Sequence, residues 1–277
     1  MKAVILAAGR GSRLGQYTEK KPKGLLELAG KTILEIQIEC LRSAGITDIS
    51  IVKGYKGEEI KFTDVKYYWN EDYDNTNMVV SLMKAVIEFT DDIIISYADI
   101  IYEKRLLEQL INSKSEAAIL VDLEWKKYWH MRYGTSSYDL ESLIIDSLGN
   151  IIEIGRPDVT ENNMMSRYIG LLKFSKNNLN HIKSIVLEAE KLYCDTPWKH
   201  SRKPYKKAYM TDLLQALIDV GIELKAEQVV NGWLEFDSES DYENVLTWLS
   251  NGSINVLFGN DIGSFQKLIG QEKNMQC

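Results

Sequence analysis

The sequence predicts an α/β fold, in which a doubly wound, mixed but mostly parallel sheet carries helices on both faces and has a small β-rich insertion. Several apolar runs are continuous rather than alternating, as in strands that are buried on both faces. These runs alternate with amphipathic helical segments, which is the pattern of parallel βαβ units. The 277 residues, 45% hydrophobic and 26% charged, are typical of a globular chain with one large domain.

The first half of the chain follows this pattern in order. Residues 3–8 (AVILAA) form an apolar strand that stops at Gly9. Thr32 and Glu35 have the spacing of a capping box, which predicts a helix that ends before Gly45. The same reasoning predicts further strands and helices, with strands at 48–52, 65–69, 92–99 and 116–123 and helices that open near 77 and 104.

Beyond residue 123 the sequence no longer alternates strands with helices. An aromatic segment, a hairpin that turns at 147–150 and a strand at 167–174 indicate an insertion, about 124–165 in extent, that adds strands over one edge of the sheet. The pattern then predicts helices at about 177–193, 210–220 and 238–250, and a strand at 232–237, which complete the core. We therefore expect one domain, residues 1–250, followed by a C-terminal tail, residues 251–277.

Charge and cysteine content exclude several classes of protein. The formal net charge of -7 argues against a general nucleic-acid binder. Cys40, Cys194 and Cys277 lie far apart, so neither a zinc site nor a disulfide framework is indicated, and we expect a reducing, cytoplasmic compartment. The apolar start of the chain is too short to span a membrane, and we expect no membrane partner.

The strongest chemical signal is the loop AAGRGSRLG at 7–15, directly after the first strand. Glycines let a backbone approach a phosphate closely, and the amides and two arginines supply donors and positive charge. The loop is not a P-loop, because Leu25 stands where its first glycine is required, and Leu14 breaks the dinucleotide-binding fingerprint. It is either a third type of phosphate loop or a surface turn with solvated arginines.

The run LAAGRGSRL, together with Pro22 and Lys23, resembles the signature of nucleotidyltransferases with a Rossmann-like, nucleoside-triphosphate-binding fold. The resemblance implies that Arg13 contacts the β and γ phosphates and that Lys23 touches the reacting phosphates, so both are expected to be catalytic. It implies nucleotide binding by the rest of the loop, namely Ala7, Ala8, Gly9, Gly11 and Ser12.

Segments along the chain narrow this resemblance to the CTP-dependent cytidylyltransferases that act on phosphocholine, 2-aminoethylphosphonate and similar small acceptors. The similar segments are 54–60, 70–82, 96–103, 208–215 and 232–243. The chain is less similar to the hexose-1-phosphate branch, whose sugar-binding motifs are not identified in it. The resemblance therefore covers nearly the whole chain up to about residue 245.

Two aspartates have the chemistry of metal ligands. Asp99 stands at the carboxyl end of an apolar strand, where open α/β sheets bind ligands, and Asp237 ends the strand GWLEFD. Two carboxylates and nucleotide phosphates suit Mg²⁺, and the resemblance implies that both aspartates bind it. The alternative is helix capping, in which Asp99 caps the next helix and Asp237 or Ser238 caps another, with Asp241 completing an S-x-x-D box.

The segment DYDNTNMVVSL supplies candidates for the nucleotide or the acceptor. Asn77 and Ser81 stand around a helix start. An amide side chain can pair with a pyrimidine edge, but asparagines at turns also cap or bend the backbone. Both residues are candidates for either half of the site.

The insertion is expected to cover the acceptor site. Aromatic residues occur there at helical spacings, namely Trp125, Tyr128, Trp129 and Tyr133. They form either a cage for a choline or aminoalkyl group or a core-facing helical stripe. Asp139 is a candidate partner for an ammonium group, and Tyr168 is a candidate for another wall.

The resemblance implies that an acceptor oxyanion attacks the α-phosphorus of CTP, with Mg²⁺ as cofactor, and that pyrophosphate leaves. Since a phosphate monoester is largely ionised near neutral pH, with a second pKa of about 6, the attack requires no general base. Two alternatives are a sugar-1-phosphate uridylyl- or thymidylyltransferase and a non-catalytic sensor of nucleotide-activated metabolites. The expected partners are CTP and a small phosphorylated or phosphonate acceptor, and the sequence allows a homodimer.

Overall fold

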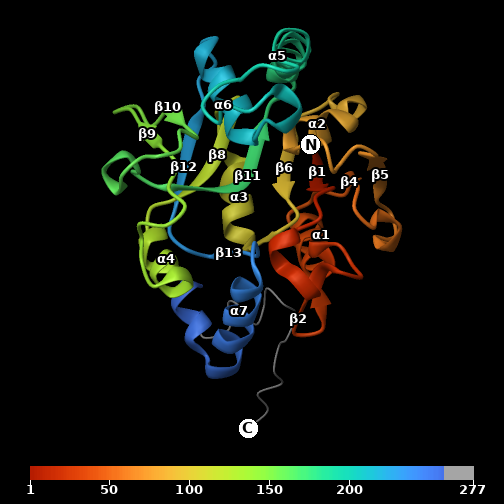
Figure 1. Cartoon of the computed structure of the whole chain (residues 1–277), viewed down its shortest axis with the longest axis vertical. Coiled ribbons are helices and arrows are strands. Elements are labelled where there is room, and N and C mark those ends of the chain that lie inside the picture. The colour runs from red at the N-terminus through yellow and green to blue at the C-terminus, as the bar shows by residue number, and fades with distance from the viewer. Residues whose placement is uncertain (259–277) are drawn as a thin grey trace.

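The structure, a computed structural model, describes residues 1–258, so residues 259–277 of the predicted tail lie outside the described part. Its main element is a seven-stranded sheet with the order β12-β8-β11-β6-β1-β4-β5 (Figure 1). The strands are β1 Lys2–Ala7, β4 Ile49–Lys53, β5 Lys66–Trp69, β6 Ile93–Tyr97, β8 Ala117–Asp122, β11 Arg167–Phe174 and β12 Lys225–Val229. Only β11 runs antiparallel to its neighbours in this sheet, which confirms the prediction of a mixed, mostly parallel sheet.

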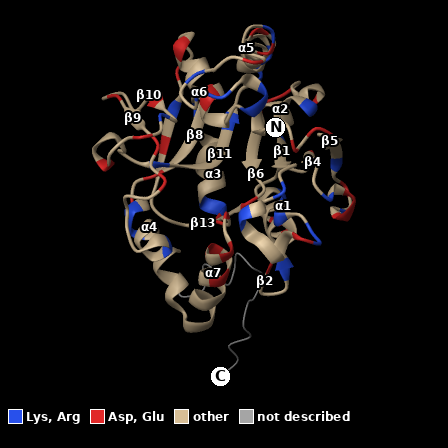
Figure 2. Ribbon diagram, in the orientation of Figure 1, with Lys and Arg blue, Asp and Glu red and all other residues tan. Residues whose placement is uncertain are grey.

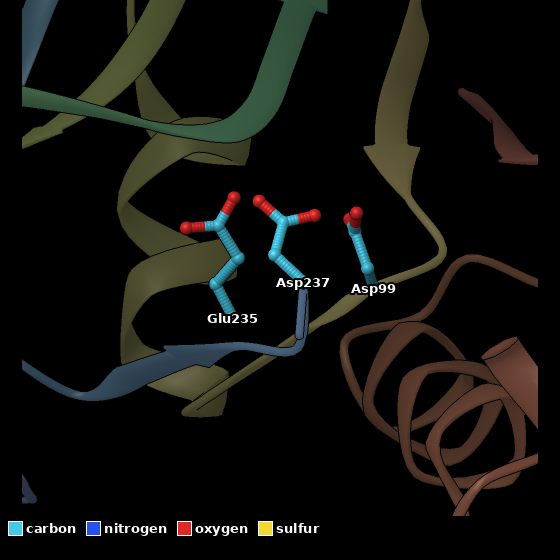
Figure 3. Close-up of side chains that lie close together, drawn as sticks. All are labelled: Asp99, Glu235 and Asp237. Atoms are coloured by element: carbon cyan, nitrogen blue, oxygen red, sulfur yellow. The ribbon is translucent and has the colours of Figure 1, made fainter. Parts of the chain in front are cut away.

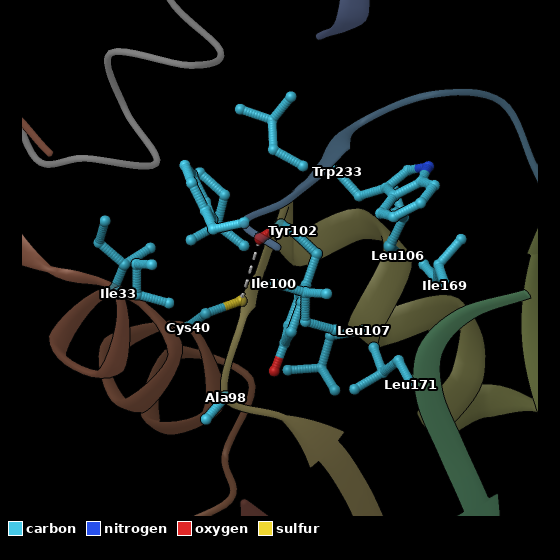
Figure 4. Packing of buried hydrophobic residues seen from close by; sticks show 14 of the residues in the cluster. Ile33, Cys40, Ala98, Ile100, Tyr102, Leu106, Leu107, Ile169, Leu171 and Trp233 are labelled. Carbon is cyan, nitrogen blue, oxygen red and sulfur yellow. Dashed lines mark hydrogen bonds between the residues drawn. The ribbon is translucent and has the colours of Figure 1, made fainter. Parts of the chain in front are cut away.

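Helices cover both faces of the sheet. Successive residues of β1 enter opposite core clusters, Ala3 and Ile5 one of them and Val4 and Leu6 the other, which is why the strand reads as a continuous apolar run. The helices are α1 Ile33–Ser43, α2 Met78–Lys84, α3 Lys104–Asn112, α4 Trp125–Tyr133, α5 Leu179–Leu192, α6 Met210–Asp219 and α7 Glu239–Asn251. Figure 4 shows one cluster, in which Cys40 of α1 and Leu106 of α3 pack among buried residues.

Helix starts follow local sequence rules. Thr32 and Glu35 form the predicted capping box at the start of α1. Asn77 caps α2, since its side-chain oxygen accepts a hydrogen bond from the backbone of Met78 at 2.9 Å. None of the helices in residues 1–258 has the length and apolar content that crossing a bilayer requires.

A short antiparallel ribbon lies outside the main sheet and was not predicted. It pairs β7, Ile100–Tyr102, with β13, Trp233–Glu235. In Figure 1 the arrowheads of β1 and β6 point toward β13 and α7, so the ribbon lies beyond the carboxyl ends of these strands. The backbone amide of Phe236 donates to the carbonyl of Asp99 at 2.8 Å, which brings the residues after β6 and after β13 side by side.

The structure corrects three expectations about the sheet and the tail. The strand at 167–174 lies inside the sheet between β8 and β6, rather than at an edge with the insertion. Strand β12 was missed because this edge strand is short and buries only Ala226 and Val229 of its five residues, with no regular alternation. The core also continues past residue 250, because Ile254 and Leu257 are buried in it, so the predicted boundary of the tail falls too early.

The predicted hairpin is present as β9, Leu143–Ile145, and β10, Ile151–Ile154, which pair antiparallel. Lys and Arg residues (blue) and Asp and Glu residues (red) are interspersed over most elements, whereas the charged residues of α7 are all acidic (Figure 2).

One buried guanidinium joins three elements around the ribbon. Arg132 of α4, with a side chain only 1% exposed, donates from Nε and Nη2 to the carboxylate of Asp241 in α7 at 2.7 and 2.8 Å. Its Nη1 donates to Glu235 of β13 at 2.6 Å. Asp241 also accepts from the backbone amides of Asp237 and Ser238, at 3.0 and 2.8 Å. Arg132 therefore fixes the chain where β13 leads into α7.

We expect Arg132→Ala to lower the free energy of unfolding by about 3–5 kcal/mol, because it leaves the Asp241 carboxylate buried without its cation. Arg156→Ala is the matched control, since Arg156 is half exposed and pairs with Glu153 at the surface. This control should cost less than about 1 kcal/mol. Urea titrations of both variants measure the difference, and equal losses would contradict the importance of the buried pair.

Candidate active site

A cavity of about 580 Å³ opens beside the ribbon. The glycine loop lines it with Ser12 and Arg13, β13 and the chain just after it with Glu235 and Asp237, and the insertion and the start of β11 form the other side. Its position beyond the carboxyl ends of parallel strands is the usual ligand site of an open α/β sheet. The cavity therefore brings together segments from both ends of the chain.

The glycine loop turns sharply after β1. Gly11 has a φ of 66°, and a side chain there would place its Cβ 3.1 Å from the Cβ of Lys23, so a glycine is required both for the turn and for the close approach of Lys23. The hydroxyl of Thr18 donates to the carbonyl of Gly11 at 3.1 Å and closes the loop. Gly9 is exposed, whereas the side chains of the predicted Ala7 and Ala8 are buried in the core and do not line the cavity.

The two predicted cations face the two predicted aspartates. Lys23 Nζ forms an ion pair with Asp99, and Arg13 Nη2 lies 3.2 Å from Asp237 Oδ2. Burial by itself lowers the pKa of Lys23, but Asp99 and Asp237 outweigh it and raise this pKa, so the ammonium stays charged. The structure therefore brings all four residues into one charged cluster.

A third carboxylate, Glu235, joins the cluster and was missed from the sequence. One carboxylate oxygen from each of Asp99, Glu235 and Asp237 lies within 4.8 Å of the other two. Figure 3 shows the three side chains in a row, two from the chain at β13 and one from the chain after β6. Since alternate residues of a strand share a face, the position of Glu235 two residues before Asp237 was the available signal.

The carboxylates suit a hard divalent cation. Asp99 Oδ1 is buried and has no hydrogen-bond partner in residues 1–258. Burial raises the pKa of Glu235, and the neighbouring carboxylate of Asp237 raises it further. Three crowded carboxylate oxygens, one of them unsatisfied, are a donor set that fits Mg²⁺.

The capping alternative is confirmed for Ser238 with Asp241, which form the predicted box, but neither Asp99 nor Asp237 caps a helix in residues 1–258. Ser238 caps α7, and its hydroxyl accepts from the amide of Asp241 in a complete capping box. Asp99 is separated from α3 by β7, and α3 begins at Lys104. The side chains of Asp99 and Asp237 are therefore available to the cavity.

The two candidate residues near α2 differ in whether they line the cavity. Asn77 lines the cavity and donates to the carbonyl of Lys207 at 3.3 Å. Ser81 is buried, accepts a hydrogen bond from the side chain of Asn70 at 2.9 Å and does not line the cavity. The prediction that Ser81 contacts a ligand is wrong, because its hydroxyl faces the contact between α2 and the chain after β5.

The predicted aromatic cage is wrong. Trp125, Tyr128 and Trp129 are at most 1% exposed and pack in the core, with the rings of Tyr128 and Trp233 5.2 Å apart. Tyr133 is half-buried against Trp129 and also does not line the cavity. The core-facing stripe is the correct interpretation, because α4 needs this face to pack against the ribbon and α7.

Asp139 and Tyr168 do line the cavity, as predicted, and several further residues line it that the sequence analysis missed. These are Glu141, Ser166, Arg167 and Tyr209. They belong to loops and to the ends of elements, where no periodic pattern marks a side chain as facing a site.

Comparisons with known proteins identify relatives of this chain. Residues 3–147 match the family described as the MobA-like NTP transferase domain. A CTP:phosphoglutamine cytidylyltransferase of Campylobacter jejuni is 38% identical over 256 residues, which are 88% of this chain and 98% of that relative. A choline-phosphate cytidylyltransferase of Streptococcus pneumoniae is 32% identical over 151 residues, 53% of this chain and 65% of the relative, so the match spans just under two thirds of its length.

A solved structure supports the fold. The CTP:phosphocholine cytidylyltransferase from Streptococcus pneumoniae superimposes with a TM-score of 0.69 at 22% identity, covering 90% of this chain and 98% of that one. The match confirms the predicted Rossmann-like nucleotidyltransferase fold, and the sequence matches confirm the resemblance that the motifs indicated. The chain belongs to the family of MobA-like NTP transferase domains.

Proposed function

We propose that the protein is a Mg²⁺-dependent cytidylyltransferase that transfers CMP from CTP to a small phosphorylated or phosphonate acceptor and releases pyrophosphate. The observation that carries this proposal is the placement of Arg13 and Lys23 opposite the carboxylates of Asp99, Glu235 and Asp237 in one cavity. The choice of CTP is supported by the names of the two cytidylyltransferase relatives.

The proposed reaction is a displacement at phosphorus. An acceptor oxygen forms a bond to the α-phosphorus of CTP, the bond from that phosphorus to the bridging oxygen of the β-phosphate breaks, and pyrophosphate leaves. Lys23 and Arg13 offset the negative charge of the reacting and departing phosphates, as fixed cations near developing charge do in other enzymes. The acceptor enters already ionised, so no side chain has to remove a proton.

Asp99, Glu235 and Asp237 are the residues that would hold Mg²⁺, which when bound supplies a Lewis acid for phosphate oxygens. Arg132 and Lys23 hold these carboxylates in place through the contacts described above. Positioning of two bound reactants alone can contribute about 7–11 kcal/mol, so a site without acid-base residues is sufficient for this chemistry.

Cytoplasmic location and the absence of nucleic-acid and membrane partners stay predictions, as does a homodimer.

We expect Lys23→Ala to lower kcat by about 10²- to 10³-fold while it changes the Kd of CTP much less, because the ammonium acts chiefly on the reacting phosphates. Lys21→Ala is the control, since Lys21 forms only a surface ion pair with Glu27. Steady-state pyrophosphate release and calorimetric CTP binding measure the two effects. An unchanged kcat in Lys23→Ala would remove this residue from the chemistry.

Asp99→Asn and Asp237→Asn should each suppress turnover and raise the Mg²⁺ concentration needed for half-maximal rate, because each removes a charged oxygen ligand. They should also reduce the increase in melting temperature that Mg²⁺ causes in the wild-type protein. Asp91→Asn is the control, since Asp91 pairs with the amino terminus at the surface. Full activity of either site variant at low Mg²⁺ would contradict the metal assignment.

Nucleotide selectivity tests the proposed activity directly. With phosphocholine, 2-aminoethylphosphonate and phosphoglutamine as acceptors, CTP should give a kcat/KM about tenfold or more above that of UTP or dTTP. Faster pyrophosphate release from UTP or dTTP with a sugar 1-phosphate would favour the sugar branch. Tight CTP binding without turnover of any acceptor would favour a sensor.

A further inference from the structure

We propose that the acceptor carries a protonated primary amine and that Glu141, Ser166 and Tyr168 recognise it. The inference rests on the proposed function, because it assigns the acceptor half of the same cavity. Glu141 and Ser166 are absent from the residues that the sequence analysis selected.

Glu141 is a carboxylate without a hydrogen-bond or ion-pair partner among residues 1–258, although the charge of nearby Arg167 acts on it. It lines the cavity from the loop before β9, and its side chain makes no hydrogen bond or ion pair with any described residue. The neighbouring cation, Arg167, is already engaged, since its guanidinium donates to the carbonyl of Asp139 and to Asp139 Oδ2 at 3.0 Å and stacks over Trp129 at 4.3 Å. A half-buried, unpaired carboxylate facing a cavity favours a cationic ligand.

Two hydroxyl groups near this carboxylate are also unsatisfied. Ser166 Oγ and Tyr168 Oη are both buried, and neither forms a well-aligned hydrogen bond with the described residues, although the hydroxyl of Tyr97 lies close to that of Tyr168. Both side chains line the cavity. The amide of Met165 donates to the carbonyl of Leu143 at 3.1 Å, so the segment before β11 runs beside the one that carries Glu141. Because a buried hydroxyl is costly to leave unpaired, both groups indicate a ligand with hydrogen-bonding atoms.

A primary ammonium matches these three groups. It has three N–H donors, and the Glu141 carboxylate and the two hydroxyl oxygens can accept all three. A trimethylammonium group has no N–H, so it would leave both hydroxyls unpaired, and the tryptophans proposed for its cage are in the core. A neutral sugar could satisfy the hydroxyls but would leave the charge of Glu141 uncompensated.

The same residues orient the acceptor toward the reaction centre. Burial raises the pKa of Tyr168, the Tyr97 hydroxyl lowers it by less, and the carboxylates of Asp99 and Glu141 raise it further, so its hydroxyl stays protonated and lies near both carboxylates. The phosphate or phosphonate end of the acceptor would then face Lys23 and the amine end Glu141, on a short connecting chain.

Matched acceptors test the inference by calorimetry on the full-length protein with Mg²⁺ and α,β-methylene-CTP. Phosphoethanolamine and phosphocholine differ only in the three methyl groups on nitrogen, and ethyl phosphate lacks the amine. We expect phosphoethanolamine to bind about ten- to a hundredfold more tightly than either of the others, the range for a charge-assisted hydrogen bond.

Variants distinguish the loss of a specific contact with the amine from a general loss of structure. Glu141→Gln should weaken phosphoethanolamine binding by about tenfold or more and leave ethyl phosphate and α,β-methylene-CTP unchanged, and Ser166→Ala should do the same to a smaller degree. Glu153→Gln is the control, because Glu153 lies on the hairpin, pairs with Arg156 and does not line the cavity.

The outcomes distinguish the two proposals. Equal or tighter binding of phosphocholine, no binding of phosphoethanolamine at millimolar concentration, or an equal loss of ethyl phosphate in Glu141→Gln would each overturn the amine assignment while CTP-dependent turnover stood. Failure of the CTP analogue to bind, or of CTP to release pyrophosphate with any acceptor, would instead overturn the proposed function on which it rests.

Discussion

The site depends on holding three carboxylates together against their mutual repulsion. Asp99, Glu235 and Asp237 approach within 4.8 Å of one another, although like charges at such distances disfavour ionisation. Lys23 and Arg13 offset this repulsion from the cavity side, and Arg132 does so from the core. The negative cluster is thus stable only because cations from three separate segments surround it.

The fold supplies these segments through a short ribbon rather than through the main sheet. Pairing of β7 with β13 joins the middle of the chain to its end, and the bond from the Phe236 amide to the Asp99 carbonyl sets the separation of the two aspartates. Asp241 of α7 accepts a hydrogen bond from the backbone amide of Asp237 and also pairs with Arg132. It therefore connects the chain after β13 to α7. The buried ion pair therefore stabilises the backbone that carries two of the carboxylates.

The cavity has two ends with different electrostatic character. At one end, cations and carboxylates neutralise one another around Lys23 and Asp99. At the other, Glu141, Ser166 and Tyr168 present acceptor oxygens that have no well-aligned hydrogen bond within residues 1–258. Buried polar groups without partners are costly, which supports the assignment of a ligand to this end of the cavity. The aromatic residues of α4 serve the core instead, because a helix beside the ribbon must bury one face.

The sequence by itself determined the local elements and the chemistry of the glycine loop. Continuous apolar runs predicted β1 and β6, the capping box at Thr32 predicted α1, and the run ending in Arg13, with Lys23, predicted the charged side of the cavity, because each of these signals depends on neighbouring residues. Only the tertiary structure decided that β11 lies inside the sheet, that Glu235 joins the aspartates and that Trp125 and Trp129 face the core. These outcomes depend on which distant segments meet, and hydrophobic spacing is the same for a residue that faces the core and for one that faces a ligand.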